Sequence, residues 1–513
     1  MNPVPTRQVA DLTRRREDLW LEEQYWGHRL WDQQSPWLVF LEFLCVAESA
    51  YRHGYLFDFE KSQYPSAYSA FARLHLRNIL FNNEQNLLRI DAENADSATA
   101  WRKWLEWIRD NAHGLGPHQR DFSYLKDRFD SFHDFAHLVR ALRSCVLEGD
   151  TNKRWSSRFI FPFGPEAIFE DLISIKQDAT SRDYINFGRS GELLYHMLAR
   201  SSIRDRLAAI FPARVLTTNK WNNLIKQMQP QMADIAGPDR GVDTFLPYDQ
   251  HPIFELIAED WLSLLELELP GFDVVPYLVT TGAFGLLLYH LHTSARLLGH
   301  DGLTPIVCEV VAPRKGLVRE QSIECFDANS AMSIEAIDGI MGQVERTAEW
   351  NLPGQPQEVL TRRQDILKRE FSWEDESGVS DPAELWQRFK DDARSRHRRH
   401  FGQVHRTFGR GIGLVSKRGT NRFRYAPTDA FLKCLIFANV GKRMEFNDLL
   451  GRLYHRYGLV FGEREAEKVL PIEDMDKKPF QANSLRLEYR LGSLGLVKRL
   501  SDACAYVENP YSR

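Results

Sequence analysis

Apolar residues recur at helical spacing along most of the chain. In residues 11–54, two such stripes are separated by Ser35-Pro36. Because proline lacks a backbone donor and restricts the residue before it, we expect two helices that meet at this point. Further helical stripes cover residues 66–81, 97–110, 121–147, 191–210, 253–268 and 277–298. The pattern therefore predicts a mainly α-helical fold.

Tryptophan sets the first part of the chain apart. Of the 13 Trp residues, seven lie in the first 107 positions. An aromatic stripe on helices is usually part of a core, although it can also form a platform on which nucleic-acid bases stack. We expect residues 1–150 to form a Trp-rich α-helical domain with these rings inside.

The middle of the chain mixes helical and strand-like patterns. The aromatic run at 158–167 and the apolar run at 306–311 are typical of strands. Breaks rich in Pro, Gly and polar residues follow at 350–357 and 372–381. These features divide the rest of the chain into a mixed α/β domain at 151–349, a linker with a basic helix at 350–411 and a C-terminal module at 412–513.

One stretch is long enough to cross a membrane. Residues 274–295 are 22 positions without a formal charge. The stretch also contains Pro276, His290 and His292, and no aromatic and basic flank marks a second membrane face. We therefore expect a buried helix at the centre of a domain, and no membrane.

The C-terminal module has an ordered series of element signals. The segment IGLVSKRGTNRFRY (412–425) is typical of a hairpin, and Thr428 can cap the helix TDAFLKCLIFANV. A short strand precedes NDLLGRLYHRYG, which Asn447 can cap and Gly458 can end. A further helical turn, a leucine-patterned helix and two strands follow in EREAEKVL and NSLRLEYRLGSLGLVKRLSDACAYV.

Over residues 427–513, the predicted order of elements is helix, strand, helix, helix and a two-stranded wing. This order resembles a winged helix-turn-helix domain. The resemblance implies a last helix that reads DNA through Arg486, Arg490 and Ser493, which lie opposite its leucines, with Lys498 and Arg499 on phosphates. Extra residues between Gly462 and Pro479 depart from this pattern and argue against ordinary groove docking. A solvated helix face and a protein-docking face remain as alternatives.

Charge is unevenly distributed. The chain has 66 Lys and Arg against 70 Asp and Glu, a net charge of −4, yet residues 384–426 carry +9 and residues 1–383 carry −15. Cations that contact phosphates release counterions, so this segment predicts salt-dependent binding of double-stranded DNA. The alternative is that the cations of this segment form ion pairs with acidic residues elsewhere in the protein. The predicted contacts are Arg394, Arg398, Arg399, Arg406, Lys417, Arg418, Arg422 and Arg424.

No motif for catalysis is present: there is no Walker loop, GxSxG elbow or HExxH. His133 and His137 lie one helical turn apart, near Asp130 and Asp134, and would need a third ligand from elsewhere to hold zinc or iron. We expect satisfied histidines here. The sequence predicts no catalytic residue, no metal, no cofactor and no small-molecule substrate.

A nuclease is the alternative among enzymes. Glu309 lies on the apolar run at 306–311 with Asp301 upstream, but the lysine that such Mg²⁺ centres need two positions later is replaced by Val311. A paired structural carboxylate is the favoured interpretation of Glu309. A divalent-metal nuclease centred on this residue remains the alternative.

The six scattered Cys residues and the charged start of the chain predict a reducing cytoplasm and no secretory signal. Through FLKCLIFANV, LYHRYGLVFG and RLEYRLGSLGLVKRLSDACAYV, the whole chain resembles subunits of bacterial anti-phage defence cassettes. The resemblance implies a non-catalytic DNA-binding adaptor beside other subunits, such as a translocase or a modification enzyme. A protein-docking scaffold without DNA contact is a further alternative.

Overall fold

The structure is a computed structural model of the full chain. It describes residues 21–27, 30, 32–60, 74–82, 84–93, 96–144, 172–176, 179–182, 190–217, 220–230, 245–311, 316–417, 419, 422–470, 476–501 and 504–512. Most of these residues are helical, and the strands are short, as the hydrophobic pattern predicts. The strand-like run at 158–167 lies outside the described residues.

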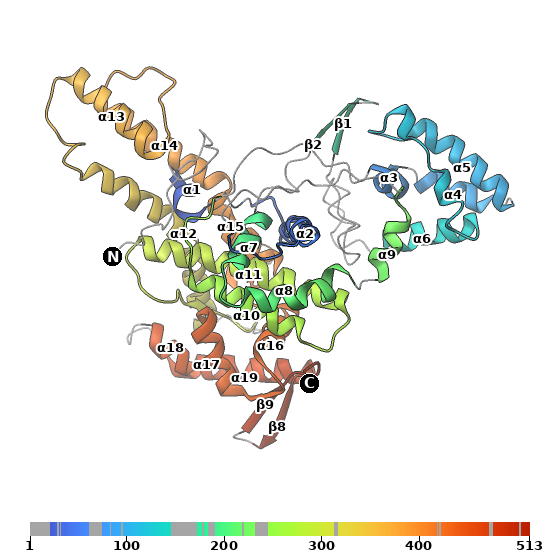
Figure 1. Ribbon diagram of the computed structural model, residues 1–513. Helices are drawn as coiled ribbons and strands as arrows, with labels where there is room; N and C mark the ends of the chain where they lie inside the picture. Colours follow the sequence, from blue (N-terminus) through green and yellow to red (C-terminus); the bar gives the residue numbers. More distant parts are fainter. Residues whose placement is uncertain are drawn as a thin grey trace.

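A bundle of helices forms the centre of the molecule (Figure 1). It comprises α1 (Leu21–Trp26), α2 (Pro36–Arg52), α7 (Ser190–Ala199), α8 (Arg204–Phe211), η8 (Pro212–Leu216), α10 (Pro252–Leu265) and α11 (Gly271–Leu297). Pro36 occupies the first turn of α2, as predicted from Ser35-Pro36. Close approach of α7 to α2 depends on Gly191, because a Cβ there would lie 2.5 Å from the backbone nitrogen of Phe43.

Helix α11 is the long apolar segment of the sequence. Residues Asp273–Leu297 are long and apolar enough to cross a membrane, but 83% of their most apolar window is buried inside the protein. Trp261 of α10 and Tyr289 of α11 are fully buried in the same core. The expectation of a buried central helix is confirmed.

Residues 74–144 form a separate helical unit at one end of the molecule (Figure 1). Its elements are α3 (Leu74–Arg77), η3 (Asn78–Asn82), α4 (Glu84–Ala92), α5 (Ser97–Asn111), η4 (Pro117–Gln119), η5 (Ser123–Leu125) and α6 (Phe132–Ser144). Trp101 and Trp104 are buried against Phe135, so the core interpretation of these aromatic residues is confirmed. The first 150 residues are not one unit, because α1 and α2 belong to the central bundle.

Few strands interrupt the helices between the helical unit and the C-terminal module. Strands β1 (Leu172–Lys176) and β2 (Ala179–Arg182) form an antiparallel pair, and α9 (Lys220–Gln227) follows. The predicted strand at 306–311 is ordered as a strand only over β3 (Ile306–Val307), which pairs in parallel with β7 (Leu459–Val460). Through this pair, the C-terminal module shares a sheet with the central body.

The predicted linker at 350–411 is mostly helical. It contains α13 (Pro356–Phe371), α14 (Pro382–Arg399), η9 (Phe401–Gln403) and α15 (Val404–Gly411), and it follows the long helix α12 (Leu317–Glu345). The rings of Trp350 and Trp386 lie 4.6 Å apart and both are buried. Helix α14 packs on α12, and α13 packs on α14.

The C-terminal module begins with a hairpin and continues with alternating helices and strands. The hairpin is β4 (Val415–Ser416) and β5 (Arg424–Tyr425), and the module continues with α16 (Asp429–Asn439), β6 (Arg443–Glu445), α17 (Phe446–Tyr457), β7, α18 (Glu463–Val469), α19 (Lys477–Ser493), β8 (Val497–Ser501) and β9 (Cys504–Glu508). Strands β6, β9 and β8 form an antiparallel sheet in that order. Thr428 and Gly458 cap their helices as predicted, whereas Glu445 takes the N-cap position expected of Asn447.

Candidate nucleic-acid interface

The basic end of α14 presents two uncompensated arginines. The helix begins as predicted, because the carboxylate of Asp381 accepts the backbone N–H groups of Ala383 and Glu384. Near its other end, Arg398 and Arg399 are exposed and form no ion pair with any residue that the structure describes. They border a surface hollow of about 450 Å³. Asp391, Arg394 and Ser395 line the same hollow.

A second group of cations gathers around Phe423. The guanidinium carbon of Arg406 lies 5.5 Å from the centre of this ring, and the Nζ atom of Lys417 lies 4.8 Å from it. Phe423 itself stacks on Phe326 of α12, with ring centres 5.5 Å apart. Stacking leaves both charges exposed and without an acidic partner among the described residues. Arg410 follows Arg406 by one turn of α15 and is also exposed.

Two other arginines of the basic segment are neutralised by α12. The Nε atom of Arg394 donates to Asp338 over 2.7 Å, and Arg422 pairs with Asp327. Eleven residues separate these two aspartates, which corresponds to about 16 Å along a helix. Helix α12 is therefore an acidic counter-surface for the basic segment. Ion pairs within the protein therefore neutralise part of the +9 charge of residues 384–426, in agreement with the alternative interpretation of this segment.

Arg424 is not available to DNA. Its side chain is 2% exposed and forms an ion pair with Glu309, whose side chain is 3% exposed. The backbone N–H of Glu309 also donates to the carbonyl of Tyr425 over 2.9 Å. A buried charge must be paired to be tolerated, and Arg424 and Glu309 each provide the opposite charge that the other needs. The prediction that Arg424 contacts DNA is wrong, and Glu309 is the paired structural carboxylate that the sequence favoured.

Arg490 of α19 is also held by the protein. Arg490 donates to the carboxylate of Asp429 over 2.5 Å and to the carbonyl of Pro427 over 3.1 Å. The hydroxyl of Ser493 donates back to the carbonyl of Arg490 over 2.7 Å, and Arg486 is half-buried. These three residues do not form the fully exposed reading face that their spacing suggests, because Arg486 and Arg490 are only partly exposed and Arg490 is engaged by Asp429 at the start of α16.

The two strands after α19 keep exposed cations. Lys498 and Arg499 of β8 are both exposed, and the Nε atom of Arg499 lies 3.7 Å from a carboxylate oxygen of Glu488. An ion pair at this distance on the surface is weak, and both side chains are exposed to solvent. Arg418, another predicted contact, lies outside the described residues.

Two large apolar side chains of α19 are exposed to solvent. Leu485 is 42% exposed and Tyr489 is 61% exposed, and Leu500 on the neighbouring strand β8 is 55% exposed. Sequence reasoning missed this face because it placed the outward stripe directly opposite the leucines Leu487 and Leu491. The signal was an apolar residue directly before each arginine, Leu485 before Arg486 and Tyr489 before Arg490.

Buried polar side chains fix this module to the body. The amide of Asn483 in α19 accepts the backbone N–H of Val310 over 2.8 Å, and it donates to the carbonyls of Cys308 and Phe461 over 3.0 and 2.9 Å. One side chain thus joins α19 to the segments that follow β3 and β7. Breaking it would leave several buried groups unsatisfied, so α19 is held rigidly.

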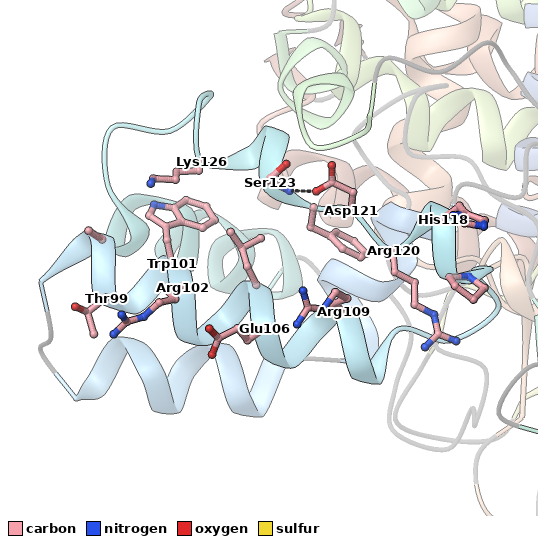
Figure 2. Close-up of a pocket in the computed structure, with 14 residues that line it drawn as sticks. Thr99, Trp101, Arg102, Glu106, Arg109, His118, Arg120, Asp121, Ser123 and Lys126 are labelled. Carbon is pink, nitrogen blue, oxygen red and sulfur yellow. Dashed lines mark hydrogen bonds between the residues drawn. The ribbon is translucent and has the colours of Figure 1, made fainter.

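A larger surface hollow, of about 740 Å³, lies on the helical unit (Figure 2). Arg102, Glu106 and Arg109 of α5 lie along one side, with Asp121 and Ser123 opposite. Hydrogen bonds from Ser123 hold the pKa of the Asp121 carboxyl below its usual range. The hollow carries charges of both signs and is separate from the cations of α14 and α15.

Protein-family profiles, curated proteins and solved structures were each compared with the chain, and none matches it.

Proposed function

We propose that the protein is a non-catalytic, DNA-binding adaptor subunit of a bacterial multi-protein complex, acting in the cytoplasm in defence against phage. The observation that carries the DNA contact is the set of exposed cations on adjoining elements of α14, α15 and the β4–β5 hairpin. Those without an acidic partner among the described residues are Arg398, Arg399, Arg406, Arg410 and Lys417. Cations of this kind bind phosphates without reading sequence.

The C-terminal module supports a winged-helix assignment within this proposal. Helices α16, α17 and α19, with the sheet β6-β9-β8, follow the order expected of such a domain. Lys498 and Arg499 then lie on the wing, where they can contact phosphate. The engaged side chain of Arg490 argues against base reading by α19, so we propose a DNA contact without sequence specificity.

A second candidate function, protein docking, is favoured by the apolar face of Leu485, Tyr489 and Leu500. Tyrosine is enriched among the residues that dominate protein interfaces, and burying exposed leucine is favourable as well, whereas neither offers much to a phosphate backbone. In Figure 1, α14 and α19 lie well apart on the molecule. An adaptor could therefore contact DNA near α14 and α15 and another subunit at α19.

The nuclease alternative is not favoured. Glu309 is buried and engaged by Arg424, so it presents no accessible carboxylate to a solvated divalent ion. The position of Glu309 therefore supports a non-catalytic role.

The test compares two variants with the same change in net charge. In the first, Arg398, Arg399, Arg406 and Lys417 become Ala; in the control, Arg102, Lys103, Arg109 and Lys126 of the helical unit become Ala. All eight side chains are exposed. The first variant should lose affinity for duplex DNA, and the slope of log K against log salt should fall by about 3 to 4. Equal loss in both variants, or none in the first, would contradict the proposal.

A further inference from the structure

The helical unit brings two histidines and one aspartate together on its surface. His133 and His137 lie one turn apart on α6, and their ring centres are 3.9 Å apart. The Nδ1 atom of His133 lies 2.7 Å from a carboxylate oxygen of Asp91, the last residue but one of α4. One potential ligand atom from each of the three residues lies within 4.8 Å of the other two.

The third residue could not be found from the sequence. Asp130 and Asp134 are the carboxylates nearest to the histidines along the chain, but the hydroxyl of Ser131 donates to the Asp134 carboxylate over 2.6 Å at the start of α6. Asp91 lies 42 residues before His133, and the packing of α4 on α6 brings it into position. The sequence-based expectation that no metal site exists depended on this missing ligand.

The chemistry of the three groups suits a first-row transition metal. Two imidazoles and one carboxylate form a common ligand set for Zn²⁺ and related divalent ions. Zinc bonds of about 2.0–2.2 Å place tetrahedral ligands about 3.3 Å apart, so the present arrangement must contract somewhat. The His133 side chain is 62% exposed and can adjust its rotamer, whereas the Asp91 side chain is only 8% exposed and is fixed.

We propose that Asp91, His133 and His137 form a Zn²⁺ site that joins α4 to α6. Three protein ligands leave one coordination position for water or for a side chain of another molecule. Binding replaces the His133–Asp91 contact between α6 and α4 with bonds from three side chains to one ion, so the metal stabilises the helical unit. The site is independent of the cations proposed to contact DNA.

The full-length protein, freed of metal with a chelator, is titrated with Zn²⁺ in competition with a chromogenic zinc indicator. One ion should bind per chain, and the melting temperature should rise. Asp91→Asn and His137→Ala should each weaken binding by about tenfold or more. The matched controls Asp130→Asn and His118→Ala change exposed residues outside the group and should bind zinc as the unaltered protein does.

Circular dichroism establishes that each variant remains folded. A metal-dependent increase in ellipticity or melting temperature that survives in Asp130→Asn but vanishes in Asp91→Asn would support the site. Equal zinc affinity in Asp91→Asn and Asp130→Asn would overturn it, and so would the absence of stoichiometric binding to the unaltered protein.

Discussion

Arg424 and Glu309 lie 115 residues apart in the chain and form an ion pair in which neither side chain is more than 3% exposed. The pair joins the β4–β5 hairpin to the segment that follows β3. Because both side chains are buried, Arg424 is not part of the basic surface and Glu309 is not accessible as a catalytic carboxylate. The pair is therefore a structural connection between the central body and the start of the C-terminal module.

The first prediction concerns this pair. Arg424→Met leaves the Glu309 carboxylate buried without a counter-charge, and we expect the free energy of unfolding to fall by about 3 to 5 kcal/mol. Adding Glu309→Leu should restore most of the loss, because the uncompensated charge is gone. Urea unfolding of both variants provides the measurement. Equal stability of Arg424→Met and the unaltered protein would show that the pair is not buried.

The second prediction is a pH dependence that originates in the core. His290 is buried, and neither ring nitrogen has a hydrogen-bond partner among the described residues. Burial lowers the pKa of His290 to about 3. The nearby His405 is buried too, and burial together with His290 lowers its pKa to about 3.

Between these values and the ordinary histidine pKa of about 6.5, the unfolded chain binds protons that the folded chain does not. The contribution of these two neutral histidines to the free energy of unfolding is fully present above about pH 6.5, and it is lost as the pH falls toward 3. Between about pH 5 and 6, His290→Phe should reduce the slope of unfolding free energy against pH by about 1 kcal/mol per unit. The exposed His118→Phe is the control, and an unchanged slope in His290→Phe would be the contrary result.

The third prediction concerns helix packing. Gly191→Ala places a methyl group 2.5 Å from the backbone nitrogen of Phe43 and 2.6 Å from the Cβ atom of Glu42. Since backbone atoms cannot yield cheaply, we expect a loss of about 1 to 3 kcal/mol. Gly492→Ala, an exposed helical position with nothing within 4 Å, should instead stabilise by up to about 1 kcal/mol. Thermal unfolding compares the two, and a neutral Gly191→Ala would refute the close contact.

The fourth prediction tests whether the exposed face of α19 is distinct from the surface that contacts DNA. Leu485→Ser with Tyr489→Ser changes only exposed apolar side chains, so folding stability and DNA affinity should stay close to those of the unaltered protein. Arg490→Ala, which breaks an ion pair with Asp429, should likewise alter DNA affinity little. Fluorescence anisotropy with labelled duplex measures both. A loss of DNA affinity of about tenfold in either variant would return base reading to α19.

Local features of this fold could be predicted from sequence because they depend on neighbouring residues. The caps at Asp381, Thr428 and Gly458 belong to this class, since each satisfies backbone groups within one turn of its helix. Glu445 and Asn447 compete for one helix start, and there the local signal was ambiguous by two residues.

Long-range pairings could not be predicted in the same way. Nothing near Arg422 or Arg424 in the chain indicates that α12 and the segment after β3 carry their acidic partners. The orientation of α19 also depends on the long-range bonds of Asn483 and Arg490, and Tyr489 is the most exposed of its large apolar residues. The candidate DNA contacts are therefore fewer than the charge of the segment suggests.

The most direct measurement of DNA binding uses a labelled duplex of about 35 base pairs, titrated with the full-length protein across a salt series in the presence of Mg²⁺. The DNA is examined for cuts afterwards. We predict affinity that falls linearly in log–log form as salt rises, with the duplex intact. No binding even at low salt would contradict the DNA-binding adaptor and leave the protein-docking scaffold, and cut DNA would contradict the non-catalytic role.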